Sequence, residues 1–338
     1  MPLPLRLLRS LQGASPDQAW SAILEYAWDV FSSPVQGKTR AEITARDRAL
    51  ASIDLFLATA GWDLWASYEQ AVPRTADILA EWWTCRSGGR AVLILDGLSL
   101  REVPWILEQA RKRGYTLHQA RPTGAELPAD TTPFTNALGL PSRSSLANNG
   151  APASNRLGGA RTDTVDLPWE DCVPLISPEP SWVLWHQWPD KRVHDLDGHG
   201  KGIDRLLQET RETLTGDAFW KLVERLSNGR RLVITADHGY AASGGFPDVV
   251  DPEQSKYLKR VYKAGRFTSG GAEEPVWVPP LDLDIQTTHG RYRFVLGRRK
   301  WKAQGGYPTL THGGLTVLEV AVPFIEISPG PDTSEDEP

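Results

Sequence analysis

Cysteine is scarce in this sequence, since only Cys85 and Cys172 occur among its 338 residues. Two cysteines cannot build the disulfide framework of a small secreted domain or a thiolate zinc site. Long apolar runs are also missing, because no stretch of about 18 apolar residues occurs and the N-terminal "MPLPLRLLRSLQG" holds no sustained apolar segment. These features do not predict a signal peptide or a membrane span, and we expect a cytoplasmic protein.

Positive charge is not in excess either. The chain has 37 Lys and Arg against 42 Asp and Glu, which gives a net charge of -5 and an isoelectric point near 5.9. This balance argues against a protein that holds nucleic acid mainly through a basic surface. A polyanionic substrate would therefore need a local source of positive charge, and bound metal ions are the obvious one.

The first part of the chain, residues 1–88, is predicted to be a helical region. The stretch "SPDQAWSAILEYAWDVF" begins with a Ser cap, a Pro at the first helical position and an acid, and apolar residues then recur at three- and four-residue spacing. The chain holds 14 Trp, and their clustering between residues 20 and 83 favours packing between helices. A docking surface for a protein partner is the alternative interpretation of these residues.

After residue 88 the pattern changes to strand, turn and helix, which predicts an α/β domain over residues 89–327 with a largely parallel central sheet flanked by helices. Residues 245–285 mix Pro, Gly and charge and are expected to form a flap, and residues 328–338 are expected to be an acidic disordered tail. "GRYRFVLGRRKW" is expected to be an edge strand or a hairpin. The expected core strands are "AVLILDG", "SWVLWHQW", "RRLVITAD" and the end of "LTVLEVAVPFIEI".

Polar residues follow the first three of these strands, at the places where an open α/β sheet binds its ligands, and one histidine lies just before the last segment. Three are carboxylates and three are imidazoles, and they are Asp96, Asp190, His194, Asp237, His238 and His312. A mixed nitrogen and oxygen set of this size is enough for two divalent cations. Zinc suits it best, with manganese next and magnesium as a further candidate.

This prediction rests on where the candidate ligands lie relative to the strands, because the individual motifs are short. With 23 Asp and 7 His, about 0.5 Asp-His dipeptides are expected by chance. A strand-terminal Asp such as Asp96 is also often a helix cap. The remaining histidines, which include the decoys His199 and His289 before Gly, are interpreted as ordinary surface or core residues, as are His118 and His186.

A nucleophile is expected in "NALGLPSRSSLANNG", which offers Ser142, Ser144 and Ser145 in a Pro-opened turn that begins a helix. The free N–H groups of a helix N-terminus favour an attacking alkoxide and phosphoryl oxygens. Ser142 as a simple helix cap is the alternative, and spacing does not choose among the three serines.

Taken in order, these elements resemble the PglZ-domain family of the alkaline phosphatase superfamily over roughly residues 90–325. The similar stretches are "LILDGLSLREVPWIL", "LPSRSSLANN", "WPDKRVH", "ITADHG" and "THGGLTVLEVAVPFI". The resemblance implies Ser144 as the nucleophile, with Ser142 as the fallback. Arg143 lies next to Ser144 and is a candidate phosphate contact, with a solvated residue at the helix start as the alternative. After Ser144 the sequence turns polar earlier than the family pattern does, and Gly139 stands where a sulfatase would need cysteine.

The metal ligands follow from the same resemblance. It implies that Asp190, His194 and His312 hold one metal, and that the other metal, beside Ser144, is held by Asp96, Asp237 and His238. From this resemblance we expect a phosphodiesterase or phosphatase that acts on nucleotide or nucleic-acid-like esters. It would work in a bacterial anti-phage system of the BREX type or in signalling. The alternatives are a scaffold that binds partners through its Trp-rich N-terminal helices, and a phosphomutase of the same superfamily.

Overall fold

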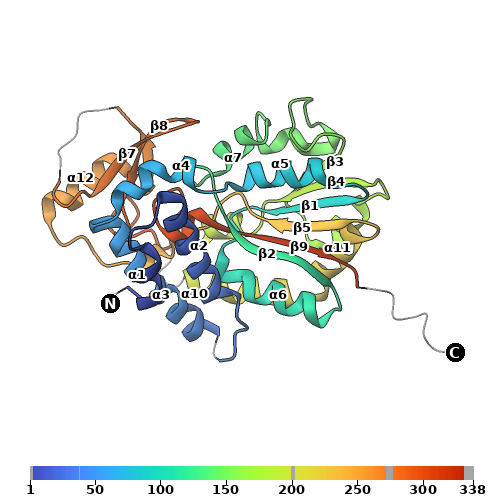
Figure 1. Cartoon of the computed structure of the whole chain (residues 1–338), viewed down its shortest axis with the longest axis horizontal. Coiled ribbons are helices and arrows are strands. Elements are labelled where there is room, and N and C mark those ends of the chain that lie inside the picture. The colour runs from blue at the N-terminus through green and yellow to red at the C-terminus, as the bar shows by residue number, and fades with distance from the viewer. Residues whose placement is uncertain (1–2, 38, 199–201, 272–276, 331–338) are drawn as a thin grey trace.

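Two sheets, one of six strands and one of three, organise the part of the chain that the structure describes (Figure 1). The structure is a computed structural model, and it describes residues 3–37, 39–198, 202–271 and 277–330. The strands are β1 (Arg90–Leu95), β2 (Thr116–Gly124), β3 (Arg161–Val165), β4 (Ser181–His186), β5 (Arg231–Thr235), β6 (Phe267–Ser269), β7 (Asp282–Thr287), β8 (Gly290–Val295) and β9 (Ala321–Ser328).

Helices precede, connect and flank these strands. The α-helices are α1 (Leu5–Leu11), α2 (Pro16–Ser32), α3 (Thr39–Thr59), α4 (Tyr68–Ala71), α5 (Thr75–Cys85), α6 (Val103–Lys112), α7 (Thr131–Ala137), α8 (Trp169–Cys172), α9 (Asp190–Leu196), α10 (Gly202–Thr215), α11 (Asp217–Ser227), α12 (Pro252–Tyr262) and α13 (Val317–Val320). Short 3-10 helices are η1 (Trp62–Ser67), η2 (Leu100–Glu102), η3 (Arg143–Asn149), η4 (Val173–Leu175) and η5 (Ser243–Gly245). None of the described helices is both long and apolar enough to cross a bilayer.

The six-stranded sheet has the strand order β2-β9-β5-β1-β4-β3. β5, β1, β4 and β3 are parallel, while β9 runs antiparallel to both of its neighbours. The expected α/β fold with a largely parallel central sheet flanked by helices is therefore confirmed. Four expected strands form the centre of the sheet, whereas the expectation did not include the edge strands β2 and β3.

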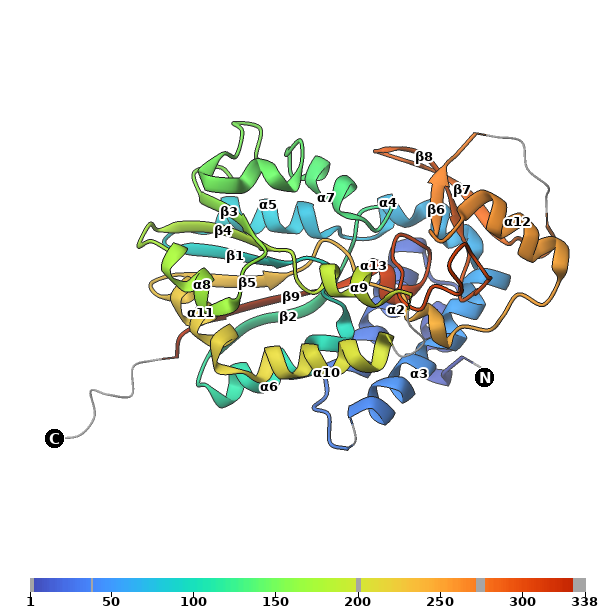
Figure 2. The same ribbon diagram turned by 180° about the vertical axis from the view of Figure 1, so that it is seen from behind.

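Alternate residues of β1 pack on opposite faces of the sheet, as the pleat requires. Leu93 and Leu95 belong to the larger apolar cluster, which also holds residues of α2, α3, α6 and α11. Val92 and Ile94 belong to the second cluster, with residues of α5 and α7. Figures 1 and 2 show α5 and α7 on one side of the sheet and α6 and α11 on the other, and this double cover explains why β1 is a continuous apolar run.

The N-terminal helices share their core with the sheet. α2 begins as its sequence predicts, with Ser15 and Gln18 forming a capping box. Trp20 is fully buried in the larger cluster, where its ring packs 4.7 Å from that of Trp65 and 5.1 Å from that of Tyr68. The same cluster continues into the central strands, so these tryptophans pack the core.

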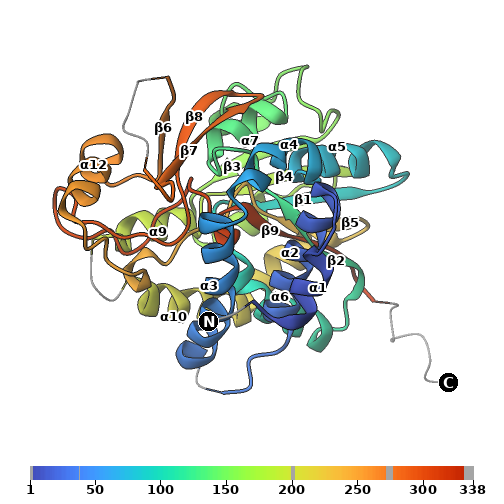
Figure 3. The same cartoon turned by 60° about the vertical axis from the view of Figure 1, so that its left-hand side comes forward.

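The expected flap, over its described residues, contains α12, β6 and part of β7. β7 and β8 pair as an antiparallel hairpin, and β6 joins β8 to complete the three-stranded sheet. Figures 2 and 3 show this sheet and α12 at one end of the molecule, beyond α9. The stretch "GRYRFVLGRRKW", expected to be an edge strand or a hairpin, thus contains β8, which is one strand of a hairpin.

Buried ion pairs fasten α3 to the rest of the domain. Asp47 accepts hydrogen bonds from Arg101 of η2 at 2.5 and 3.1 Å, and it also pairs with Arg298. Arg298 donates to Asp54 at 2.7 Å, and the other oxygen of Asp54 accepts from the N–H of Val317 at 2.8 Å. α3 is therefore joined to the element after β1 and to the helix before β9.

Glu102 of η2 is a fully buried carboxyl that supports the loop after β5. Its oxygens accept hydrogen bonds from the N–H of Ser99 at 3.0 Å and from the hydroxyl of Tyr240 at 2.7 Å. Burial raises the pKa of Glu102 from its ordinary 4.5 to about 7. The folded chain thus binds more protons than the unfolded chain between these two values, so stability falls as pH rises through that window.

We expect Glu102→Gln to raise the melting temperature at pH 8 relative to the wild type, because it removes the buried charge. At pH 5 the difference should shrink, since Glu102 is then protonated in the folded chain. Calorimetry at the two pH values measures this directly. An equal difference at both values would mean that Glu102 does not carry the pH dependence.

Candidate metal centre

The carboxyl ends of β5, β1 and β4 meet at one edge of the sheet, because these strands are parallel neighbours. Asp96 follows β1 directly, and its backbone accepts a hydrogen bond from the N–H of Asp190 at 2.9 Å. Gly97 has φ +70° there, and a Cβ on it would lie 3.0 Å from the Cβ of Asp190. Glycine therefore allows the two carboxylate-bearing segments to approach this closely.

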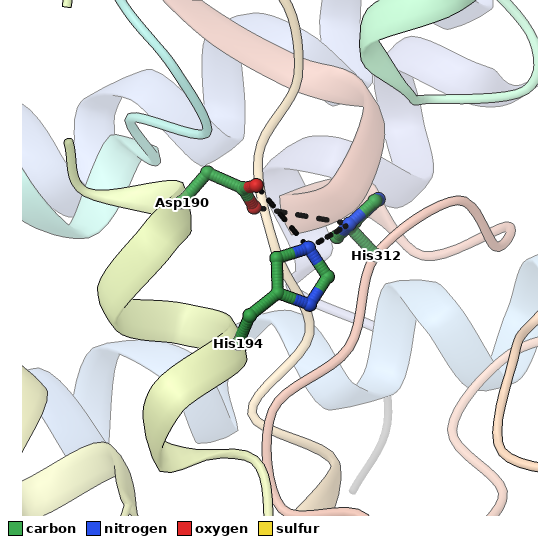
Figure 4. A group of neighbouring side chains, drawn as sticks. All are labelled: Asp190, His194 and His312. Carbon is green, nitrogen blue, oxygen red and sulfur yellow. Dashed lines mark hydrogen bonds and ion pairs between the residues drawn. The ribbon is translucent and has the colours of Figure 1, made fainter. Parts of the chain in front are cut away.

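One group of ligand atoms comes from α9 and from the loop before α13. Asp190 and His194 are four residues apart on α9 and face the same side, with Nε2 of His194 3.2 Å from Oδ2 of Asp190. His312 completes the group, since its Nε2 lies 3.3 Å from Nε2 of His194 and 3.8 Å from Oδ1 of Asp190 (Figure 4). Three side chains thus converge on one point, as metal ligands do.

A second group is buried deeper, at the ends of β1 and β5. Asp96, Asp237 and His238 are fully buried. Nε2 of His238 lies 3.7 Å from Oδ1 of Asp96 and 3.6 Å from Oδ2 of Asp237. The other oxygen of Asp237 accepts hydrogen bonds from the N–H groups of Gly97 and His238, both at 3.0 Å, which fixes the orientation of that carboxylate.

The two groups are in contact. Ligand atoms of Asp96, Asp190 and His238 lie within 4.8 Å of one another, so Asp190 of the first group lies against two members of the second. The rings of His238 and His312 stack with centroids 4.3 Å apart. The six residues singled out in the sequence are therefore brought together into one cluster.

The hydrogen bonds of His238 indicate what this cluster can hold. Its Nδ1 lies 2.9 Å from the carbonyl of Gly239, so Nδ1 carries a proton. Its Nε2 faces two carboxylates and is buried with no hydrogen-bond partner among the described residues. That nitrogen must therefore carry a second proton or bind a cation. A divalent cation fits, because neutral imidazole and carboxylate are ligands of zinc and manganese.

Charges in the cluster perturb its pKa values in the pattern of a cation site. Burial, and then the charges of Asp237 and Asp190, raise the pKa of Asp96 well above its usual value. Burial opposes ionisation of His238 too, but Asp237, Asp190 and Asp96 outweigh it and raise the pKa of His238 to about 9. Burial also acts on Asp190, whose pKa is nevertheless lowered by the hydrogen bond to His194. The buried negative charge of the cluster therefore favours a protonated histidine or a bound cation.

A threonine that sequence reasoning missed lies against this cluster. The hydroxyl of Thr131, the first residue of α7, donates to Oδ2 of Asp237 at 2.7 Å and lies 3.4 Å from Oδ1 of Asp96. The available signal was "LPADTTPF", in which Asp130 caps a short helix and Thr131 follows. A hydroxyl next to two candidate ligands has the position that a nucleophile needs.

The serines expected to supply the nucleophile lie in η3, and not at the start of a regular helix. Ala147 and Asn148 have non-helical backbone angles, with φ +51° at Asn148. Ser144 is exposed, and its hydroxyl contacts that of Ser142 at 2.9 Å. Arg143 reaches the site, because its guanidinium pairs with Asp96. The expected start of a helix is thus corrected to a short 3-10 turn.

Three of the four histidines interpreted as ordinary residues have other partners. His118 contacts Ser328 at 2.8 Å, and His289 lies 3.4 Å from Glu126. His186 is held by the N–H of Trp188 and the carbonyl of Leu167, both at 3.0 Å. His199 lies outside the described residues.

Comparison with known proteins gives no family, because no family model and no curated protein matches the chain. Matching solved structures include murine ectonucleotide pyrophosphatase/phosphodiesterase 5. In an inactive form with AMP it shares 13% identity, with a TM-score of 0.44, over 72% of this chain and 88% of that chain. A second structure shares 14% identity over the same portions, with a TM-score of 0.41. At these TM-scores the likeness carries no conclusion about this chain.

We expect zinc or manganese to stabilise the wild type against heat, because a ligand at 100 times its Kd adds about 2.7 kcal/mol to the free energy of unfolding. His238→Gln should lose most of this stabilisation. His118→Gln is the matched control, since it removes an imidazole outside the cluster. Differential scanning fluorimetry with and without EDTA measures the shift. Equal shifts in both variants would show that the metal binds elsewhere.

Proposed function

We propose that this protein is a metal-dependent phosphoesterase of the alkaline phosphatase type, with a PglZ-like domain. The observation that carries the proposal is the convergence of six metal-ligand side chains with the hydroxyl of Thr131, 2.7 Å from Asp237. The order of the motifs along the chain supports it independently. The same sheet edge supplies candidate ligands, nucleophile and a guanidinium, which together are the groups that phosphoryl transfer uses.

Two divalent cations, zinc before manganese or magnesium, are the proposed cofactors. Asp190, His194 and His312 would hold one of them, and the proposed ligands of the other are Asp96, Asp237 and His238. When bound, such cations lower the pKa of a nearby hydroxyl and stabilise the phosphoryl oxygens. The approach of Asp190 to Asp96 and His238 supports two neighbouring sites.

Thr131 is the proposed nucleophile. Its hydroxyl donates to Asp237, which leaves the oxygen lone pairs for attack on phosphorus. As the hydroxyl proton passes to Asp237, attack forms an Oγ1–P bond and breaks the P–O bond to the leaving alkoxide, which takes a proton from water. A second water then hydrolyses the phosphothreonine and restores the hydroxyl of Thr131. Ser144 remains the alternative nucleophile, but its described partner is Ser142. Arg143, already held against Asp96, is proposed to contact a phosphate oxygen.

A phosphodiester of nucleotide or nucleic-acid type is the proposed substrate, which rests on the family resemblance. The same resemblance supports a role in bacterial anti-phage defence or signalling. A protein partner is proposed to dock on the N-terminal helices, where Leu5 and Leu8 of α1 are 61% and 49% exposed.

We expect the wild type with zinc or manganese to hydrolyse bis-p-nitrophenyl phosphate, and Thr131→Ala to lower kcat by about 10³-fold or more, because the attacking group is gone. Thr132→Ala is the matched control, since it removes the neighbouring hydroxyl and keeps the N–H that Asp130 binds. Release of p-nitrophenol measures the rate, with the monoester p-nitrophenyl phosphate run in parallel.

Ser144→Ala belongs in the same series. If it abolishes turnover while Thr131→Ala remains fully active, the nucleophile is the serine expected from the sequence. Failure of the wild type to cleave either ester with any divalent ion would refute the phosphoesterase proposal and favour a scaffold.

A further inference from the structure

Asp130 lies directly before Thr131, and its carboxylate faces two partners. Oδ1 accepts a hydrogen bond from the N–H of Thr132 at 3.3 Å and so caps α7. Oδ2 lies 3.5 Å from Nδ1 of His312. This separation is about 0.5 Å longer than a usual N–H···O hydrogen bond and within the range of an ion-pair contact. One carboxylate thus contacts both the helix that carries Thr131 and a proposed metal ligand.

His312 needs such a contact on its far nitrogen. Its Nε2 points at Asp190 and His194, where a cation would sit. Its Nδ1 is buried and has no hydrogen-bond partner among the residues that the structure describes. A neutral imidazole ligates through Nε2 only when its proton is on Nδ1, and a carboxylate next to Nδ1 selects that tautomer.

Capping alone does not account for the position of Asp130. Asp251, which caps α12, directs Oδ1 at two backbone N–H groups, those of Glu253 at 2.8 Å and Gln254 at 3.0 Å. Asp130 binds one N–H at the longer distance of 3.3 Å, with its second oxygen toward His312. Its side chain is therefore shared between helix and imidazole.

We propose that Asp130 is a positioning residue that holds His312 with its proton on Nδ1, so that Nε2 is free to bind a cation. Because the same carboxylate caps α7, it also fixes the hydroxyl of Thr131 relative to that ligand. This inference rests on the metal centre of the proposed function. It adds a residue that neither touches the substrate nor binds the metal.

Two substitutions separate capping from positioning. Asp130→Ser keeps a capping oxygen but removes the group that reaches His312. Asp130→Asn keeps the cap through its carbonyl oxygen and turns an N–H₂ donor toward Nδ1, which favours the wrong tautomer. Asp251→Ser, at the N-cap of α12, is the matched control, because it replaces a capping Asp at a site without an imidazole.

We expect both Asp130 variants to weaken zinc binding by about 10- to 100-fold, the usual effect of removing a group that orients a ligand. Competition with a chromophoric chelator measures the dissociation constant, and Asp251→Ser should match the wild type. Long-range ¹H–¹⁵N NMR of the metal-free protein gives a second readout. There His312, assigned by loss of its signals in His312→Gln, should carry its proton on Nδ1 in the wild type and shift toward Nε2 in Asp130→Asn.

Wild-type zinc affinity in both Asp130 variants, with an unchanged tautomer, would overturn the inference and leave the proposed function intact. Absence of zinc binding by the wild type itself would overturn both. Circular dichroism of each variant confirms that it is folded. If Asp130→Ser unfolds, the tautomer and affinity of Asp130→Asn decide the question.

Discussion

The site depends on one constraint. Carboxylates are buried together at the carboxyl ends of the parallel strands, where they repel one another. Two like charges 4 Å apart repel by about 4 kcal/mol at an effective dielectric constant of 20. Asp96 and Asp237 are fully buried, and Asp190 lies against Asp96, so the folded chain concentrates negative charge that it must neutralise. Histidines, a guanidinium and, in our proposal, two cations surround these carboxylates for that reason.

Support for the carboxylates comes from the N-terminal helices as much as from the sheet. Asp47 and Asp54 of α3 bind Arg101, Arg298 and the N–H of Val317, and these groups flank the segments that carry Asp96 and His312. Burying these charges costs desolvation free energy, and their ion pairs and hydrogen bonds offset that cost. The helical region is thereby part of the structure that positions the proposed ligands, whatever else docks on its outer surface.

The sequence predicted the fully buried central strands but not the strands at the edges of the sheet. The central strands are continuous apolar runs because helices cover both faces, whereas β2 and β3 lie at the two edges of the sheet and carry polar residues. The ends of these strands, together with the loop before α13, also indicated six side chains that the structure brings together, and their role as metal ligands stays a prediction. Thr131 was missed because a single hydroxyl has no periodic signal, and only its approach to Asp237 distinguishes it from the serines of η3.

The position of β9 has a consequence for how the chain folds during synthesis. Residues 321–328 insert between β2 and β5, so the sheet stays divided until this strand has left the ribosome. Pairings over such sequence separations form slowly, because the loops they close are long. Until then the edge of β5 that β9 covers is unpaired, and an unpaired apolar strand edge favours aggregation.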